Sequence, residues 1–106
     1  MIEGNQLLKE SIAISSSGNN TVIAAPANGY IAIDHINFIP TSAVTVTLND
    51  GDKTYIYPLD SKQAFTIENA IANSSGVITC KAKTAFIINL SSAVTVGGMI
   101  RYRIVI

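Results

Sequence analysis

Hydrophobic and polar residues alternate along most of the chain with a period of two, which places successive side chains on opposite faces of a β-strand. Between Leu8 and Ser15, Ile12 and Ile14 alternate with serine and alanine. In Ala43–Leu48, valine and leucine alternate with threonine in the same way. The pattern therefore predicts a chain built from strands.

Turn residues divide the chain into about nine short strand candidates, a spacing that is typical of a β-sandwich or barrel. We expect an all-β fold, an antiparallel β-sandwich of jelly-roll type, with a closed barrel as the alternative. Residues 1–10 are expected to form a short N-terminal arm, and residues 11–106 a single domain. The candidate strands are Leu8–Ser15, Thr21–Ala25, Tyr30–Ile39, Ala43–Leu48, Lys53–Tyr57, Gln63–Glu68, Gly76–Ala82, Thr84–Leu90 and Ala93–Ile106.

Several positions interrupt this simple pattern. The alternation in Tyr30–Ile39 changes phase, which predicts a bulge or bend near Asp34-His35. Pro58 is expected to end its strand, and Gly97-Gly98 predicts a bulge or a close approach of two backbones. Asn69–Gly76 is expected to be a loop, with one helical turn around residues 70–72.

One five-residue segment occurs twice. The sequence Ser-Ala-Val-Thr-Val spans Ser42–Val46 and again Ser92–Val96, fifty residues later. Ile36–Pro40 and Phe86–Leu90, which precede the two copies, are similar in character. Either the segments form equivalent strand–turn–strand units in two sheets, or the same five residues occur twice by chance because the strands use few residue types.

The composition excludes several classes of protein. Hydrophobic residues make up 48% of the 106 residues and charged residues only 13%, with seven basic side chains balancing seven acidic ones. Disorder requires the opposite composition, and a protein that binds nucleic acid through phosphates needs a basic excess. We find no signal peptide and no apolar run of membrane-spanning length, so we expect synthesis in the cytosol and no membrane partner. The low charge indicates that a partner covers much of the surface.

The sequence offers little catalytic chemistry. His35 is the sole histidine, and no nucleophile signature accompanies it, so we interpret it as a structural strand residue. Cys80 is expected in the core. Asn49–Asp52 carries hard oxygen ligands that calcium could use, but it lacks the further ligands of a calcium loop and reads as an Asp-Gly hairpin turn. We predict no catalytic residue, no metal site and no cofactor.

Two sets of surface residues are candidates for binding. Tyr55 and Tyr57 alternate beside a turn that contains Asp50 and Asp52, an arrangement suited to stacking against a sugar. The alternative is that these tyrosines pack on the sheet and keep only their hydroxyl ends in water.

Basic residues alternate in two strands and so face one side in each. Lys81 with Lys83, and Arg101 with Arg103, form these pairs. The balanced net charge argues against a nucleic-acid groove, and a solvated or inter-subunit face is the preferred interpretation.

The C-terminal segment Asn89–Tyr102 resembles the ending of small β-sandwich structural proteins of tailed bacteriophages. Thr21–Ile33 and Ala43–Gly51 resemble the opening strands and the following hairpin of the same proteins. The resemblance covers about residues 20–106. It implies a virion component such as a capsid decoration protein, a head-fibre base or a tail accessory protein, often trimeric.

Together, the residues and the resemblance predict a non-enzymatic virion structural protein that decorates or stabilises a capsid. Its expected partners are copies of itself, preferably as a trimer, and a major capsid or tail protein. The candidate interface residues are Ile2, Leu7 and Leu8 in the arm and Arg101 and Arg103 in the last strand. The alternative is a carbohydrate- or receptor-binding module at a fibre tip, and an enzyme built around His35 is the third reading.

Overall fold

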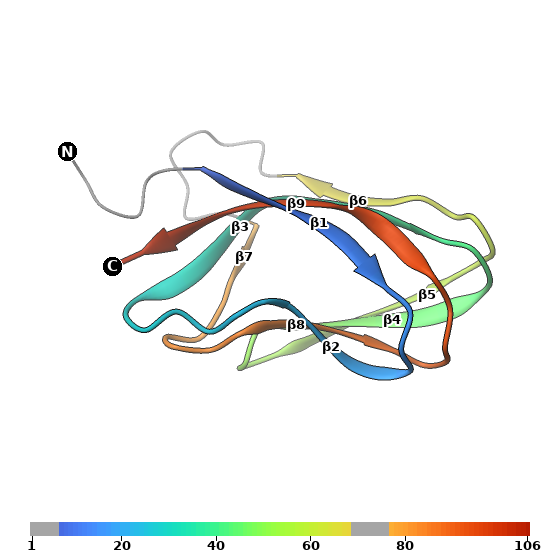
Figure 1. Cartoon of the computed structure of the whole chain (residues 1–106), viewed down its shortest axis with the longest axis horizontal. Helices are drawn as coiled ribbons and strands as arrows, with labels where there is room; N and C mark the ends of the chain where they lie inside the picture. Colours follow the sequence, from blue (N-terminus) through green and yellow to red (C-terminus); the bar gives the residue numbers. More distant parts are fainter. Residues whose placement is uncertain (1–6, 69–76) are drawn as a thin grey trace.

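In the computed structural model, which describes residues 7–68 and 77–106, the chain forms nine β-strands in two antiparallel sheets that pack face to face (Figure 1). Sheet A has the order β1-β9-β3-β6, with the two-residue β7 beside β3, and sheet B has the order β2-β8-β4-β5. The strands are β1 (Leu8–Ile14), β2 (Gly18–Ile23), β3 (Tyr30–Pro40), β4 (Val44–Asn49), β5 (Thr54–Leu59), β6 (Phe65–Glu68), β7 (Ile78–Thr79), β8 (Phe86–Leu90) and β9 (Val96–Val105).

The path of the chain confirms the predicted jelly-roll sandwich. Successive strands cross from one sheet to the other, except where β4 and β5 form a hairpin and where β7 follows β6. With the short β7 set aside, four strands remain in each sheet, as in a jelly roll. Leu8, Lys9 and Glu10 pair with β9, so the first strand extends into the range that we assigned to an arm. Ile2 lies outside the described residues.

The two sheets enclose one apolar core, which explains why alternating sequences form these strands. Each sheet buries every second side chain of its central strands and leaves the intervening ones at the surface. Phe65 stacks on Phe38 with ring centroids 4.7 Å apart and also meets the ring of Tyr57 at 4.4 Å, so it joins the sheets where β5 leads to β6. The largest fully buried side chains are Phe38, Phe86, Ile31, Ile33, Ile36, Leu48, Ile88, Leu90, Ile100, Val46, Val96 and Pro40.

Strand β3 contains the predicted bulge. Ile33 pairs with Tyr102 and His35 with Arg101, the next residue on β9, so Asp34 is the extra residue at the register shift. The bulge lets Ile33 and Ile36 both point into the core although they are three residues apart. Asp34 and His35 consequently both lie on the outer face of sheet A.

Other boundaries differ from the sequence expectation for local reasons. Strand β2 begins at Gly18, before the expected start at Thr21, because residues 18–20 pair with β8. Pro58 does not end β5, which continues to Leu59. Proline is tolerated there because β5 is an edge strand and Pro58 needs no donor on its open side. The helical turn expected around residues 70–72 lies outside the described residues.

The repeated segment marks two corners of the sandwich that lie side by side. Each copy forms the turn between a strand of one sheet and a strand of the other, β3 to β4 and β8 to β9. The corners exchange equivalent hydrogen bonds: the Thr41 N–H donates to the Thr95 carbonyl, and the Ser91 N–H donates to the Thr45 carbonyl. The fifty-residue offset relates both donors and both acceptors, so the two copies are structurally equivalent units.

Gly98 lies where strands β9 and β3 approach closely. A Cβ atom added to Gly98 would lie 2.0 Å from the carbonyl oxygen of Asn37 and 2.6 Å from Cα of Phe38. The neighbouring Gly97 has space, since its nearest atom would be the Ile12 oxygen at 3.8 Å. The expected close approach is therefore present, whereas the pairing of β3 with β9 continues through both glycines without a shift.

We predict that Gly98→Ala lowers the free energy of unfolding by about 3 kcal/mol or more, because the new methyl group must push two backbones apart. Gly97→Ala is the matched control and should stay within about 1 kcal/mol of the parent chain. Urea unfolding of both variants measures the difference. Equal stability of the two variants would contradict the close approach at Gly98.

Candidate functional site

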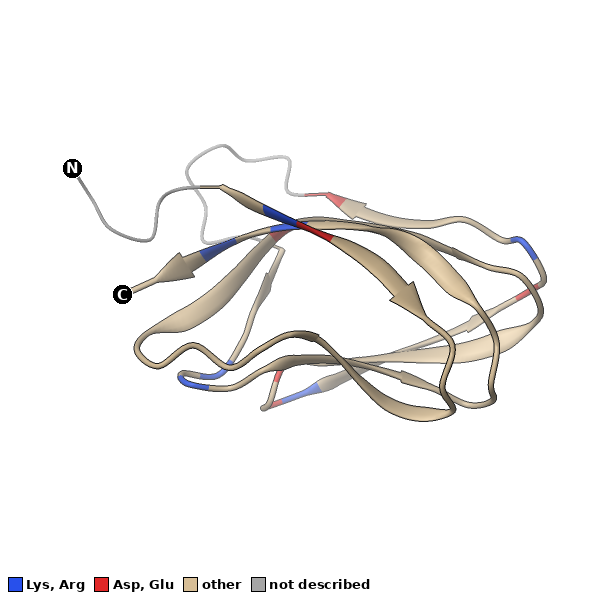
Figure 2. Cartoon of the chain, in the orientation of Figure 1, with Lys and Arg blue, Asp and Glu red and all other residues tan. Residues whose placement is uncertain are grey.

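Charged side chains are distributed unequally between the two sheets. All of those that lie within strands belong to sheet A, on β1, β3, β6 and β9. Strands β2, β8, β4 and β5 of sheet B contain none. Figure 2 shows that the remaining charges of the described chain lie in turns. The strands of sheet B therefore form a continuous uncharged surface, and the few charges within strands lie in sheet A.

The outer side of sheet B, here called the neutral face, carries amide, hydroxyl and aliphatic side chains in cross-strand rows. One row runs Asn19, Asn89, Thr47, Ile56, and the Asn89 amide donates to Oδ1 of Asn19 at 2.8 Å. Ile56 is 64% exposed. The outward residues of the neutral face are Asn19, Thr21, Thr45, Thr47, Asn49, Thr54, Ile56, Pro58, Ile87 and Asn89.

The outer side of sheet A carries a row of ionisable side chains instead. Register places Glu68, His35, Arg101 and Lys9 side by side on four neighbouring strands. Oε2 of Glu68 lies 3.7 Å from His35 Nδ1 and 3.7 Å from Arg101 Nη2. Asn37 Nδ2 lies 2.7 Å from His35 Nε2. Arg101 and Glu68 are 38% and 62% exposed, so their ion pair contributes little stability, whereas His35 is largely buried beside them.

Arg103 and Asp34 form the closest ion pair among the described residues. Arg103 Nε lies 2.9 Å from Asp34 Oδ2, and its Nη2 donates to Asp34 Oδ1 at 3.0 Å. Both side chains are largely buried, with 18% and 21% exposure. The bulge in β3 directs Asp34 toward this arginine, so the pair links β3 to β9.

The predicted interface residues that the structure describes differ in their surroundings. Leu7 is half-exposed, whereas Leu8 packs against the core opposite Tyr102. Arg101 and Arg103 face outward from sheet A and are engaged in the ion pairs just described. Sequence analysis overlooked the neutral face, because no single strand reveals which four strands share a sheet.

The candidate glycan platform is organised as a structural turn. Asp50 is buried, and its Oδ1 accepts the N–H groups of Asp52 and Lys53 at 2.8 and 2.7 Å. Its Oδ2 accepts the Tyr55 hydroxyl at 2.9 Å. Tyr55 and Tyr57 pack against the core, which matches the alternative reading of these tyrosines as sheet packing. The two rings are therefore not displayed as an open surface for sugar stacking.

This hydrogen-bond pattern determines the ionisation of the turn. Burial raises the pKa of Asp50, but the bonds from Lys53, Asp52 and Tyr55 outweigh it, so the pKa lies below the usual value. The bond to Asp50 in turn raises the pKa of Tyr55. Asp50 is therefore ionised near neutral pH, and both of its carboxylate oxygens accept hydrogen bonds from the turn.

The thiol of Cys80 is buried in the core. Burial, with the nearby Asp50 charge, raises the pKa of the Cys80 thiol to about 12, so the thiolate is not formed near neutral pH. Within residues 7–68 and 77–106, no three His, Cys, Asp or Glu side chains lie close enough together to bind a metal ion. In the same ranges, no helix is long and apolar enough to cross a membrane.

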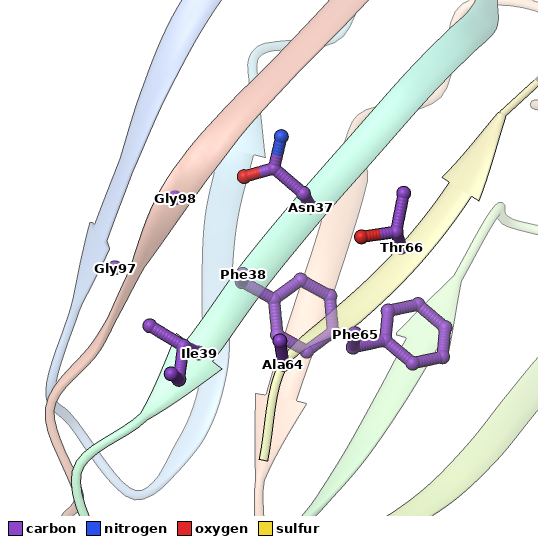
Figure 3. A pocket seen from close by; sticks show the side chains of 8 residues that line it. All are labelled: Asn37, Phe38, Ile39, Ala64, Phe65, Thr66, Gly97 and Gly98. Atoms are coloured by element: carbon purple, nitrogen blue, oxygen red, sulfur yellow. The ribbon is translucent and has the colours of Figure 1, made fainter. Parts of the chain in front are cut away.

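An open hollow of about 330 Å³ lies over β9, β3 and the start of β6. Figure 3 shows Asn37 and Thr66 as its polar side chains and Gly97 and Gly98 as bare backbone. No ionisable side chain lines it, so it offers no general acid or base to activate the Thr66 hydroxyl. The remaining lining residues are Phe38, Ile39, Ala64 and Phe65.

Comparison of the chain with family models, with curated proteins and with solved structures gives no match. The resemblance to phage structural proteins therefore rests on the sequence segments themselves.

We predict that Asp50→Ala destabilises the chain by about 2–4 kcal/mol, because it removes a charged acceptor of three hydrogen bonds. Asp52→Ala in the same turn is the control and should change stability by less than about 0.5 kcal/mol. Thermal or urea unfolding at pH 7 compares the two variants. A similar loss in both would show that Asp50 does not stabilise the turn.

Acid should weaken the same interaction. Because the pKa of Asp50 is lowered in the folded chain, its contribution is complete above the usual aspartate value of 3.8 and is lost as the pH falls through the lowered pKa. The stability difference between the parent chain and Asp50→Ala should therefore shrink as the pH falls below about 4. Urea unfolding between pH 2 and pH 7 measures it, and a constant difference would contradict this assignment.

The two outward arginines of β9 provide a further comparison. Arg103→Met should cost about 2–3 kcal/mol of unfolding free energy, because it breaks two short charge-assisted contacts to a largely buried carboxylate. Arg101→Met should cost less than about 1 kcal/mol, since its partner is mostly exposed. Urea unfolding at low ionic strength tests the order, and the reverse order would contradict it.

Proposed function

We propose that this chain is a non-enzymatic structural protein of a phage particle, which associates with copies of itself and attaches to the capsid or tail surface. The observation that carries the proposal is the neutral face of sheet B. The resemblance to small β-sandwich proteins of phage virions is the reason for proposing a phage particle as the place where the chain associates.

The chemistry of the neutral face favours association. Amide and hydroxyl groups both donate and accept hydrogen bonds, so they can be satisfied by a partner surface of the same kind. Moving such a face from water into an interface carries no cost of burying unpaired charge. Charged residues are depleted at the centre of protein interfaces, and this face has none.

The area of the neutral face indicates how strong one contact can be. Four strands spaced about 4.8 Å apart, with some six residues at about 3.3 Å each, cover roughly 400 Å². A stable pairwise complex buries about 800 Å² on each partner. One neutral face alone therefore supports a weak contact, which suits a protein held by several simultaneous contacts in a particle.

The structural use of the reactive residues supports a non-catalytic role. His35 is paired with Asn37 and lies near Glu68, and Asp50 caps a turn. These contacts occupy both side chains within the fold, and the open hollow over β9, β3 and β6 contains no ionisable side chain. The carbohydrate-binding alternative has less support, because the Tyr55 hydroxyl is bonded to Asp50.

The proposal predicts that the chain is present in tailed particles purified from cells that carry its gene. Electron cryomicroscopy should locate it with sheet B toward the particle and sheet A toward solvent. Particles from cells that produce the parent chain, but that lack it, would contradict the proposal.

A charge placed on the neutral face should weaken attachment. Thr47→Lys adds a charge at the centre of sheet B and should reduce the number of copies per particle at least about tenfold. Ser11→Lys adds the same charge to the outer side of sheet A and should leave the number unchanged. Quantitative mass spectrometry of purified particles gives the copy number, and equal losses in both variants would argue against the neutral face.

A further inference from the structure

The edges of the two sheets differ in their protection against pairing with another strand. An edge strand exposes unpaired N–H and C=O groups, and natural sheets block them with charge, bulges or short strands. Strand β1 carries Lys9 and Glu10, and β6 has only four residues and ends at Glu68. Strand β2 contains a register shift between Thr21 and Ile23. Three edges of the described sheets are therefore protected.

Strand β5 lacks these protections. It pairs with β4 over all six of its residues without a register shift, and its sequence from Thr54 to Leu59 contains no charge. Ile56 is exposed at its centre, and no strand of the described chain pairs with its outer side. Pro58 is its one blocking residue.

The hydrogen bonds of β4 identify which groups of β5 face outward. Thr45 binds Ser91 on the β8 side, through its N–H to the serine hydroxyl and through its carbonyl to the serine N–H. Thr45 therefore makes no main-chain bond to its opposite residue, Pro58. Because this pattern alternates, the main-chain groups of Thr54, Ile56 and Pro58 point to the open edge.

We propose that the β5 edge is a homophilic docking site, where β5 pairs antiparallel with β5 of a second copy across a two-fold axis. The contact joins two copies of sheet B into one continuous eight-stranded sheet. This inference rests on the proposed self-association and names the contact responsible for it. The neutral faces of the two copies then lie side by side and double the uncharged area offered to a particle.

A second copy fits this edge better than a different partner for two reasons. Only an extended strand can satisfy alternating donors and acceptors, and an identical strand offers the same row in the opposite direction. Each end of β5 is flanked by one acid and one base, Asp52 with Lys53 and Asp60 with Lys62, so the ends carry no net repulsion.

Centring the pair on Ile56 gives the largest overlap of the two strands. The two Ile56 residues exchange their main-chain bonds, and each Thr54 N–H donates to the Pro58 carbonyl of the second copy. Pro58 has no N–H to return, which leaves the Thr54 carbonyl without this bond. Pairing occupies the open edge of both copies, and the register shift in β2 interrupts the opposite edge of sheet B, so assembly along the sheet stops at two copies.

Charge substitutions at Ile56 test the inference. In a dimer centred on this residue, Ile56→Lys places two ammonium groups directly opposite each other, as does Ile56→Glu with two carboxylates. Each variant alone should raise the dimer dissociation constant at least about tenfold. An equimolar mixture of the two should restore dimers, because opposite charges then face each other. Sedimentation equilibrium of the full chain, from micromolar to millimolar concentration, measures all three samples.

Thr47→Lys is the matched control. Thr47 lies opposite Ile56 on the neighbouring strand β4 and faces the same side, but it is not at the edge. The dimer dissociation constant of Thr47→Lys should stay within about twofold of the parent value. Folding of every variant is verified by circular dichroism and cooperative urea unfolding.

The outcomes separate this inference from the proposed function. A trimeric parent chain, an oligomer that withstands both Ile56 variants, or no restoration in the mixture would overturn β5 pairing and leave a structural role in place. Loss of dimers in Thr47→Lys would indicate face-to-face packing instead. A parent chain that stays monomeric at millimolar concentration would contradict both proposals.

Discussion

Strand β3 crosses the whole of sheet A and must direct apolar side chains into the core along eleven residues. Ile31 and Ile33 fill the core in one half, and Ile36 and Phe38 fill it in the other, although the spacing between the pairs is odd. Strict alternation would turn one half of the strand inside out and expose its aliphatic residues to water. The extra residue, Asp34, removes this conflict and is directed to the outer surface, where Arg103 binds it.

The need for a bulge in β3 also makes the outer surfaces of the two sheets differ in charge. The bulge adds Asp34 and His35 to the outer side of sheet A, which the arginines of β9 already make polar. Sheet B has no bulge in its central strands, and its outward positions hold amide, hydroxyl and aliphatic groups in register. The outer side of sheet A is thus charged, whereas the neutral face can be buried at little cost when a partner's hydrogen bonds replace those to water.

Sequence patterns anticipated the strands, the sandwich and the bulge, because these depend on the alternation of neighbouring residues. They could not show features that depend on contacts between distant segments. Arg103 meets Asp34 across 69 positions, and the neutral face exists because β2, β8, β4 and β5 share a sheet. Alternation also leaves open which side of β5 faces inward. Tyr55 and Tyr57 pack inward there, and Tyr55 reaches Asp50, while the more apolar Ile56 faces water.

We expect sheet B, through its neutral face and its open edge, to be the associating side of this protein. Amide hydrogen exchange of the full chain at low and high concentration tests it most directly. If sheet B associates, the Thr54 and Ile56 amides exchange more slowly at high concentration, while the exchange of the Lys9 and Glu10 amides on the edge of sheet A does not change. Protection that rises along β1 and not along β5 would contradict it.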